Sequence, residues 1–420
     1  MPMALRKQGI DYPLLVIALL LSTFGILMVF SAGQTDMPAN FVLSAWKKQL
    51  SWFAVAIVVA FTVMRGSVRL VEWSAWPLYM LSVFLLVVVL FTGTGAGTAS
   101  SVKGWLTIGG VRLGQPAELA KLATTLMLAR VLSAQREAPK SLLELWKPLL
   151  VVGIPWLLIM KQPDLGTGIV FIGICFGMLY WSGVPWQLLL MLASPGISLI
   201  LAFSTGVWGA WFLVLVALVL WYRTYLYEGV ILVVANVVTG VVAPSIWDRL
   251  DTYQQQRLLM FLVDPSTDTK GSGWNLTQSL VAIGSGGVFG KGFTLGSQKR
   301  GGFIPERQTD FIFSVVGEEL GFIGVSVALA LFLALLLRAT RVATRASDAF
   351  PSLVAFGLLT TWLVHVIVNV GMTVNMMPVT GIPLPFFSYG GSFMVVSWIA
   401  VALLLRISAE GRGQPDALGL

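Results

Sequence analysis

Long runs of apolar residues recur along the whole chain of 420 residues, and short polar or glycine-rich segments separate them. Most runs have roughly the 20 residues that a helix needs to cross a bilayer. The runs are continuous and do not alternate with a period of two, which favours helices over the strands of a membrane barrel. The first run, YPLLVIALLLSTFGILMVFSAG, is too long and too poor in cleavage-site character for a signal peptide, so it is predicted to be an uncleaved first span.

Segments of this kind predict about 12 membrane-spanning helices. Their expected starts lie near Tyr12, Ser51, Ala75, Pro116, Pro148, Thr167, Trp186, Val207, Gly229, Phe311, Leu353 and Pro385. The pattern therefore predicts an all-α polytopic membrane protein. We expect residues 1–410 to form a single integral-membrane domain and residues 411–420 to form a disordered tail.

Composition agrees with this fold class. Charged residues make up only 11% of the chain and hydrophobic residues 57%, whereas a soluble protein carries about 25% charged residues. The net charge of +8 does not indicate nucleic-acid binding, because in a membrane protein the distribution of charge between loops matters more. The single cysteine, Cys175, lies in an apolar run and is expected to be buried as a small hydrophobic residue.

Basic residues gather on one side of the predicted spans. They are Arg6, Lys7, Arg65, Arg69, the stretch 130–147, Arg223, Arg338, Arg341, Arg345, Arg406 and Arg412. Because cytoplasmic loops carry an excess of lysine and arginine, this side is predicted to be cytoplasmic, with both termini inside. Residues 248–310 then form a large extracytoplasmic loop. Segments 93–118 and 375–392 reach the same outer face, and their glycine and aromatic content suits re-entrant or interfacial segments that line a cavity.

An aspartate lies where the large outer loop meets a long apolar run. The stretch QTDFIF is expected to start a helix, with Thr309 or Asp310 as the N-cap. A carboxylate at the outer membrane edge could act as a base or as a metal ligand. The alternative, that Asp310 is only a cap, stays open on the sequence alone.

Other acidic residues lie inside predicted spans, where ionisable groups are costly and are usually paired or functional. Glu118 and Lys121 are three residues apart, so they share a helix face and could pair. Glu318 and Glu319 lie deep in the run that follows the outer loop, and Asp164 lies at a helix junction. Both interpretations stay open: ion pairs that fix helix packing, or parts of a functional site.

The predicted outer loops are rich in basic residues, namely Lys103, Arg112, Arg249, Arg257, Lys270, Lys291, Lys299, Arg300 and Arg307. Outer loops usually avoid such density. Fixed positive charge beside a membrane suits an anionic lipid head group, especially a phosphate or pyrophosphate. A solvated basic loop is the alternative.

Two further features exclude common kinds of site. GSGGVFGKGF lacks the spacing of a nucleotide-binding phosphate loop, so its glycines predict tight turns and close backbone approach. His365 is the only histidine and is expected to be a buried packing residue, so metal sites of the His/Cys type are excluded. Any chemistry must therefore depend on carboxylates and basic groups, with or without a hard cation held by oxygen ligands.

Several of these segments, in this order, resemble the SEDS family (shape, elongation, division and sporulation) of bacterial cell-wall polymerases. They are DYPLLVIALLLSTFGILMVFSAG, GWLTIGGVRLGQPAELAKLA, QPDLGTGIV, QQQRLLMFLVDPSTDTKGSGWNLTQSLVAIGSGGVFGKGF, PERQTDFIFSVVGEELGFIG and MPVTGIPLPFFSYGGS. The resemblance covers most of the chain. Among the subfamilies it is nearer to RodA than to FtsW, because of FGKGFTLGSQ before IPERQTDF and of TGIPLPFFSYGGS near the end.

The resemblance implies a glycosyltransferase that polymerises lipid II into glycan strands on the outer face of the bacterial cytoplasmic membrane, for cell elongation and cell shape. The family's essential aspartate falls on Asp310 and its loop tryptophan on Trp105. Its intramembrane glutamate and lysine fall on Glu118 and Lys121, and its P-D-L-G-T aspartate on Asp164.

The implied chemistry assigns roles to these residues. Asp310 would act as the base, or would hold a divalent cation (Mg²⁺ or Mn²⁺) that activates the acceptor hydroxyl. Lys121 and the loop residues Arg257, Lys291 and Arg307 would bind the pyrophosphate of the substrate. The resemblance also implies partners: a class B penicillin-binding protein with transpeptidase activity, and the elongation complex around the MreB cytoskeleton.

The chain departs from the family pattern at a few positions. Gln308 stands where the family usually has histidine, so a proton relay through that histidine is excluded. Gly104 replaces the usual arginine, and Ala117 replaces the usual serine. The family typically has ten spans, so residues 207–247 are expected to be an inserted helix pair added to the ten-helix core.

Two other functions stay open on the sequence. One is a flippase or transporter of lipid-linked saccharides, since transporters are also helical bundles with intramembrane charges and broken helices. A transporter needs sites accessible from both faces, whereas this chain gathers its polar residues on one, which weakly favours the polymerase. The other is a non-catalytic scaffold of the wall-synthesis complex, for which Asp310 would be dispensable.

Overall fold

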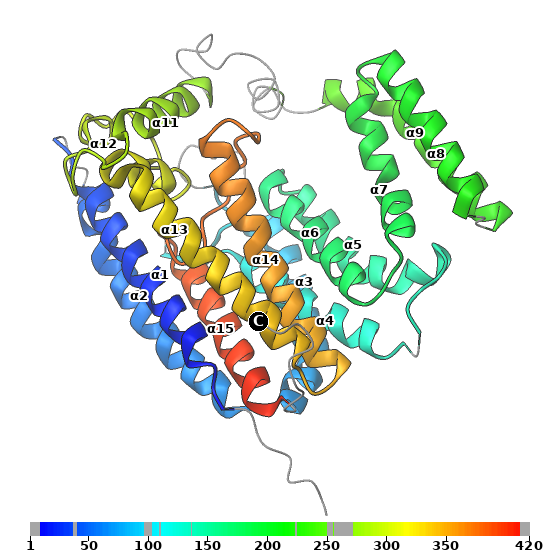
Figure 1. The fold of residues 1–420 in the computed structure, drawn as a ribbon, viewed down its shortest axis with the longest axis horizontal. Helices are drawn as coiled ribbons and strands as arrows, with labels where there is room; N and C mark the ends of the chain where they lie inside the picture. Colours follow the sequence, from blue (N-terminus) through cyan, green and yellow to red (C-terminus); the bar gives the residue numbers. More distant parts are fainter. Residues whose placement is uncertain are drawn as a thin grey trace, which may run out of the picture.

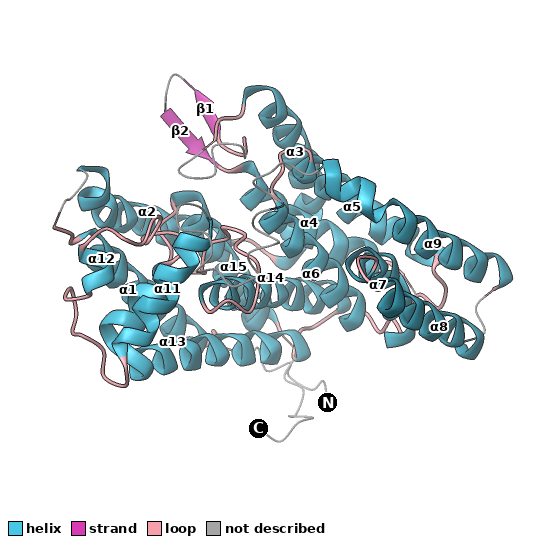
Figure 2. Ribbon diagram, turned by 90° about the horizontal axis from the view of Figure 1, so that it is seen from above, coloured by secondary structure: helices cyan, strands magenta, loops and turns pink. Residues whose placement is uncertain are grey.

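The computed structural model describes residues 9–36, 40–95, 103–108, 111–135, 137–222, 225–249, 255 and 272–411. The helices are α1 (Tyr12–Gly33), α2 (Asn40–Arg65), α3 (Val68–Thr92), α4 (Pro116–Ser133), η1 (Leu143–Leu145), α5 (Trp146–Met160), α6 (Leu165–Trp181), α7 (Trp186–Leu201), α8 (Thr205–Tyr222), α9 (Leu226–Arg249), α11 (Ser272–Gly286), α12 (Ser297–Arg300), α13 (Ile312–Thr344), α14 (Ala349–Thr373) and α15 (Gly391–Glu410). A two-stranded antiparallel hairpin, β1 (Leu106–Ile108) and β2 (Val111–Gly114), stands out from the helices (Figure 2).

Every expected span corresponds to a helix, so the all-α membrane fold is confirmed. Within the described ranges, nine helices are long and apolar enough to cross a bilayer, and α6 and α7 are shorter apolar helices. Two starts were predicted too late, because α2 and α3 begin with polar turns ahead of their apolar runs; the Ser67 hydroxyl caps α3 by accepting from the amide of Leu70. The start near Pro385 was too early, because residues up to Gly390 form a loop before α15.

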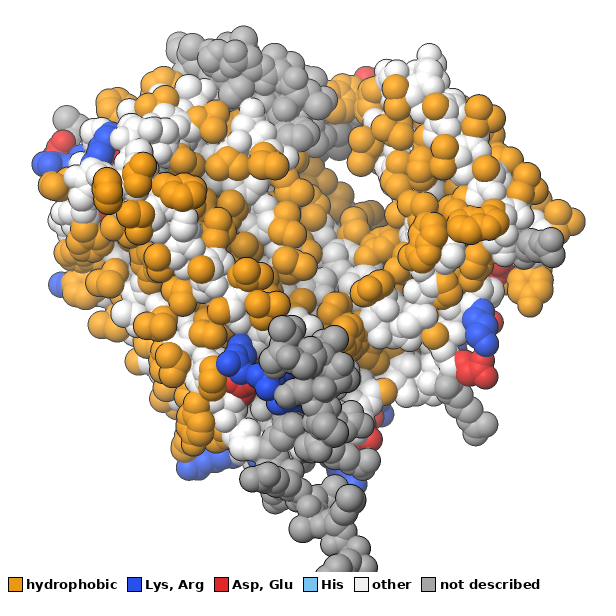
Figure 3. All heavy atoms as spheres, viewed as in Figure 1, with side chains coloured by type: hydrophobic (Ala, Val, Ile, Leu, Met, Phe, Trp, Pro, Cys, Tyr) orange, Lys and Arg blue, Asp and Glu red, His pale blue; other side chains and the backbone are white. Residues whose placement is uncertain are grey.

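The two C-terminal helices are the centre of the bundle. The spans of α14 and α15 are each 67% buried, more than any other candidate span among the described residues. α14 packs against α4, α6 and α13, and α15 packs along α2 (Figure 1). α1 begins and α15 ends at one end of the bundle, while α11 and α12 lie at the other end (Figure 1). Hydrophobic side chains cover most of the face in Figure 3, with charged side chains mainly toward its ends.

Helices α7, α8 and α9 form a group beside this bundle (Figure 1). A buried polar network joins them. Asn236 of α9 accepts from the Ser198 hydroxyl at 2.6 Å and donates to the Ser194 hydroxyl at 2.8 Å, both on α7. Trp211 of α8 donates to Ser198 at 3.2 Å. Hydrogen bonds between small polar residues are a usual means of helix association in membranes. The predicted pair 207–247 is thus two helices, while its status as an insertion stays a prediction.

Helix α13 contains a break. Inside α13, Gly321 has φ 62° and ψ −160°, so residues 312–320 form a short helix separate from the long span after it. Such a conformation favours glycine. A Cβ atom at Gly321 would also lie 2.3 Å from the backbone nitrogen of Gly290. The break therefore depends on a glycine at this position and on a close neighbour.

That neighbour is the glycine-rich loop after α11. The backbone amides of Lys291 and Gly292 donate to the carbonyls of Glu318 and Glu319, each at 3.0 Å. A Cβ atom at Gly290 would lie 2.1 Å from the Glu319 carbonyl oxygen. The predicted role of these glycines in tight turns and close backbone approach is therefore confirmed.

The two glutamates of this short helix are fully buried and paired. Glu318 accepts from the Lys291 ammonium at 3.1 Å. Glu319 accepts from the buried Lys299 ammonium and from the Ser31 hydroxyl of α1, and Lys299 also donates to Ser31 at 3.0 Å. Burial lowers the pKa of Lys299, and its bond with Glu319 opposes that shift. The interpretation of these glutamates as packing ion pairs is confirmed.

We expect Glu319→Gln to lower the free energy of unfolding by about 3–5 kcal/mol, because it leaves the Lys299 charge buried without a counter-charge. Thermal or chemical unfolding of the purified chain in detergent measures this. The double variant Lys299→Met/Glu319→Leu should recover most of the loss, since it removes both charges.

The control is Asp36→Asn, which breaks the exposed pair of Asp36 with Arg300 (3.0 Å) and should change stability by at most about 1 kcal/mol. Equal effects of the buried and exposed variants would contradict the assignment.

Candidate active site

Asp310 is half-buried in the turn that precedes α13. The expectation that Thr309 or Asp310 caps this helix is wrong: α13 begins at Ile312, and its N-cap, Phe311, makes no side-chain capping bond. The reason is local. The amide and hydroxyl of Thr309 donate to the Glu306 carbonyl, at 3.1 and 3.2 Å, and so close a separate turn ahead of the helix.

Hydrogen bonds to the backbone carbonyls of three successive residues hold this turn in place. The side-chain amide of Asn369, on α14, donates to the Asp310 carbonyl at 3.0 Å. The Ser388 hydroxyl and the Tyr389 backbone amide donate to the carbonyls of the two preceding residues, at 2.6 and 2.8 Å. The backbone of Asp310 is thus fixed by groups more than fifty residues away in the sequence.

A charged cluster lies deep in the bundle. The Lys121 ammonium is 2.9 Å from both oxygens of Glu118, which confirms the predicted pair. It is also 2.8 Å from Nε2 of His365, whose Nδ1 is 2.8 Å from the Pro383 carbonyl. A carbonyl only accepts, so Nδ1 carries the proton and Nε2 accepts from Lys121. These three side chains are at most 3% exposed.

α14 connects this cluster to Asp310. His365 and Asn369 are four residues apart, so they lie on one face and are separated by about 6 Å along the helix axis. Asn369 also donates to the Ile382 carbonyl at 2.8 Å, next to the Pro383 carbonyl that binds His365. One face of α14 therefore holds the loop before α15, the Asp310 turn and the Lys121 cluster together.

Asp164 reaches the same region from α6. As the N-cap of that helix it accepts from the amide and hydroxyl of Thr167, at 2.9 and 2.8 Å, and from the Gln115 side chain at 3.2 Å. Just after it, a Cβ atom at Gly166 would lie 2.6 Å from the Ile382 side chain. The N-terminus of α6 therefore packs against the segment that α14 holds.

The predicted loop cations are engaged elsewhere. Lys291 donates to Ser297 at 2.7 Å in addition to its pair with Glu318. Arg307 donates from Nε to the Ala32 carbonyl at 2.9 Å, and burial lowers the pKa of its guanidinium. Both side chains thus bind groups of the protein itself, and their predicted role in substrate binding stays a prediction.

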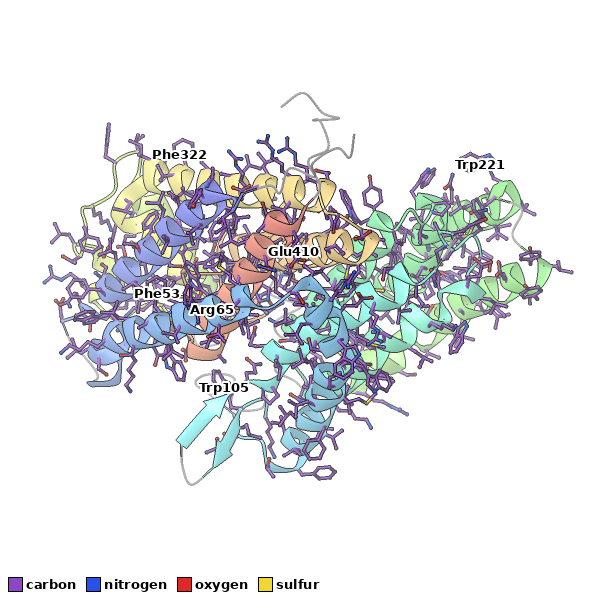
Figure 4. All side chains as sticks on the ribbon, turned by 90° about the horizontal axis from the view of Figure 1, so that it is seen from below. Phe53, Arg65, Trp105, Trp221, Phe322 and Glu410 are labelled. Carbon is purple, nitrogen blue, oxygen red and sulfur yellow. The ribbon has the colours of Figure 1, made fainter. Side chains whose placement is uncertain are left out.

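One further predicted residue, Trp105, lies directly before β1. The backbone of Trp105 pairs with that of Thr94, at 3.0 and 3.2 Å. Trp105 lies beside the hairpin, which projects from the helices (Figure 4). Arg257 lies outside the described residues.

A metal ion would need more ligands than Asp310 supplies. The described part of the chain has no group of three or more His, Cys, Asp or Glu side chains that could hold a metal. Mg²⁺ is often bound by one or two carboxylates together with substrate phosphates. The Asp310 carboxylate would therefore hold such a cation only together with oxygen atoms of a bound ligand.

Two residues that hold this site together, His365 and Asn369, were not predicted as site residues from the sequence. His365 is buried, as expected, but it also binds Lys121. Asn369 positions the Asp310 turn. The sequence offered one signal. The two polar residues are four positions apart in an apolar run, so they share one face of the helix.

Comparisons with known proteins agree with the resemblance of the motifs to the SEDS family. The family model FTSW_RODA_SPOVE, described as "Cell cycle protein", matches residues 12–209 and 205–413. Peptidoglycan glycosyltransferase MrdB of Escherichia coli (strain K12) is 34% identical over 402 residues, or 96% of this chain and 94% of MrdB. Stage V sporulation protein E of Bacillus subtilis (strain 168) is 35% identical over 415 residues, or 98% of this chain and 100% of that protein.

A solved structure is also similar. It is described as "Structural coordination of polymerization and crosslinking by a peptidoglycan synthase complex", and one of its chains matches with a TM-score of 0.71 at 27% identity, over 95% of this chain and 97% of that chain. The relatives named for wall synthesis and for sporulation match equally well, so they do not distinguish the subfamily. The chain belongs to the FtsW/RodA/SpoVE family of cell cycle proteins, which is the SEDS family that its motifs resemble.

Proposed function

We propose that this peptidoglycan glycosyltransferase polymerises lipid II into glycan strands at the outer membrane surface, and that its catalysis depends on Asp310. One observation carries the proposal. The turn that bears Asp310 is bound by Asn369, about one helical turn along α14 from the His365 side chain that binds Lys121. A carboxylate and a buried cation are thereby positioned by the same helix.

The reaction needs a base and a stabilised leaving group. The 4-hydroxyl oxygen of the acceptor sugar attacks the anomeric carbon of the donor, and the bond from that carbon to undecaprenyl pyrophosphate breaks. The hydroxyl proton passes to the Asp310 carboxylate. A positioned base contributes about 100- to 10,000-fold to such a rate. A single displacement converts an α-linked donor into a β-linked product, so one essential carboxylate suffices.

Charge on the leaving pyrophosphate must be balanced by cations. Lys121 supplies a positive charge within the region, and its bonds to Glu118 and His365 hold it there. Because Lys121 is 2% exposed, direct contact with the pyrophosphate requires the cluster to open. While the cluster is closed, the Lys121 charge acts on the pyrophosphate through its electrostatic field. Asp310 would be the residue that holds a divalent cation, which would supply further positive charge to stabilise the leaving group.

The cellular setting extends the proposal. The basic loops predict a multi-pass protein of the cytoplasmic membrane, with both termini inside and the Asp310 turn outside. The motifs nearer to RodA support a role in elongation and cell shape, together with the MreB cytoskeleton. Similarity to a chain of a complex that couples polymerisation and crosslinking supports a class B penicillin-binding protein as the partner.

We expect Asp310→Asn to lower the yield of glycan polymer at least about 100-fold, because an amide cannot accept the hydroxyl proton. The bond from Asn369 uses the backbone carbonyl of residue 310, so the turn should stay in place. The assay supplies the purified full chain, with and without its transpeptidase partner, with labelled lipid II and measures polymer on a gel.

Asp36→Asn is the matched control, because it makes the same change at an exposed outer position and should keep the full yield. A full yield from Asp310→Asn in folded protein would exclude Asp310 from the chemistry and would favour a scaffold or transporter.

His365 tests the positioning of Lys121. We expect His365→Leu to lower the polymer yield about 10- to 100-fold, since a buried hydrogen bond to a charged group contributes about 1.5–3 kcal/mol. His365→Gln should keep most of the yield, because an amide can accept from Lys121 and donate to the Pro383 carbonyl.

Both variants are compared in the same assay, and their unfolding midpoints are measured in detergent. If the two lose activity equally while remaining folded, His365 acts through its ring and not by positioning Lys121.

A further inference from the structure

A proline creates a hollow between α3 and α4. Pro77 lies inside α3 and has no backbone N–H, so it removes the helical bond to the Trp73 carbonyl and crowds that turn. α3 packs along α4, and beside the proline a hollow of about 610 Å³ remains. Trp73, Trp76, Pro77, Met127 and Arg130 line it. We refer to this set as the α3–α4 groove.

The groove faces the bilayer. Trp73 is 77% exposed and Trp76 is 50% exposed, although both belong to a span. α3 lies at the periphery of the helices, beside the hairpin (Figure 2). Indole rings are enriched at the level of lipid head groups, where one side is apolar and the other polar. The occupant in a membrane is therefore amphipathic.

Arg130 gives the groove its charge. Its Nη1 donates to the Glu72 carbonyl at a long 3.4 Å. No described carboxylate lies within 4.0 Å of it as an ion-pair partner. A guanidinium in partly apolar surroundings needs an anion, and its fork matches the oxygens of a phosphate.

The groove is distinct from the active site. Arg130 lies on α4 about 13 Å along the axis from Lys121, toward the end of the helix opposite the Asp164–Gln115 contact. Arg65 and Arg69, which are exposed, flank the start of α3 at the same end. Such clusters attract the anionic lipids of the cytoplasmic leaflet.

We propose that the α3–α4 groove binds an anionic phospholipid, with the phosphate on Arg130 and an acyl chain against Trp73 and Met127. Charge, amphipathic walls and position in a span together select a lipid over a soluble anion. The site goes beyond the proposed polymerase activity and uses none of its residues.

Native mass spectrometry of the full chain in detergent tests this. Phosphatidylglycerol and phosphatidylcholine with identical acyl chains are titrated separately. We expect the unmodified chain to retain phosphatidylglycerol about fivefold more tightly. Arg130→Gln should remove that preference, and Arg69→Gln should keep it, because Arg69 is an exposed arginine at the same end outside the groove.

Equal retention of the two lipids by the unmodified chain would overturn the proposal, and this comparison stands even if Arg130→Gln fails to fold. An equal loss in Arg69→Gln would show general surface attraction and would also overturn it. So would displacement of the lipid by inorganic phosphate, which would make the ligand a free anion, or by the transpeptidase partner, which would make the groove a protein interface.

Discussion

A charge taken out of water must find a counter-charge inside the protein, and this requirement organises the molecule. Two buried pairs meet it. Lys299 binds Glu319 and Ser31, and so joins α12 to α13 and α1. Lys121 binds Glu118 and His365, and so joins α4 to α14. Breaking a buried pair is costly, because it strands the remaining charge. Each pair therefore holds together elements that are distant in sequence.

Between these two pairs lies the turn that carries Asp310. Its carbonyls accept hydrogen bonds from α14 and from the loop before α15, and its chain continues into the helix that ends in Glu318 and Glu319. The backbone of the turn is thus held by hydrogen bonds at residues 309 and 310, and the helix that follows it is held by buried ion pairs. For the role as a base that we propose for Asp310 this matters, because a base must be held within hydrogen-bond reach of the hydroxyl that it activates.

Much of this architecture could be predicted, since hydrophobic runs alone indicate the spans and a spacing of three alone indicates the Glu118–Lys121 pair. The predictions failed where distant residues decide. A helix cap was predicted at Thr309 or Asp310, but a turn closed on Glu306 stands there, and it is held by Asn369 and Ser388, which no local pattern connects to it. Likewise, ion pairing of Glu318 and Glu319 was one of two interpretations left open by the sequence, and their partners follow from how the glycine loop docks on α13.

The break at Gly321 has a mechanical consequence. Spanning helices tilt to match the thickness of the surrounding bilayer. Here the glycine loop is bonded to both sides of the break: its amides donate to the carbonyls of Glu318 and Glu319 before Gly321, and its carbonyls at Gly287 and Val288 accept from the two amides that follow it. A change of bilayer thickness that tilts the long span would therefore also move the glycine loop and the short helix, because all three are bonded together at the break.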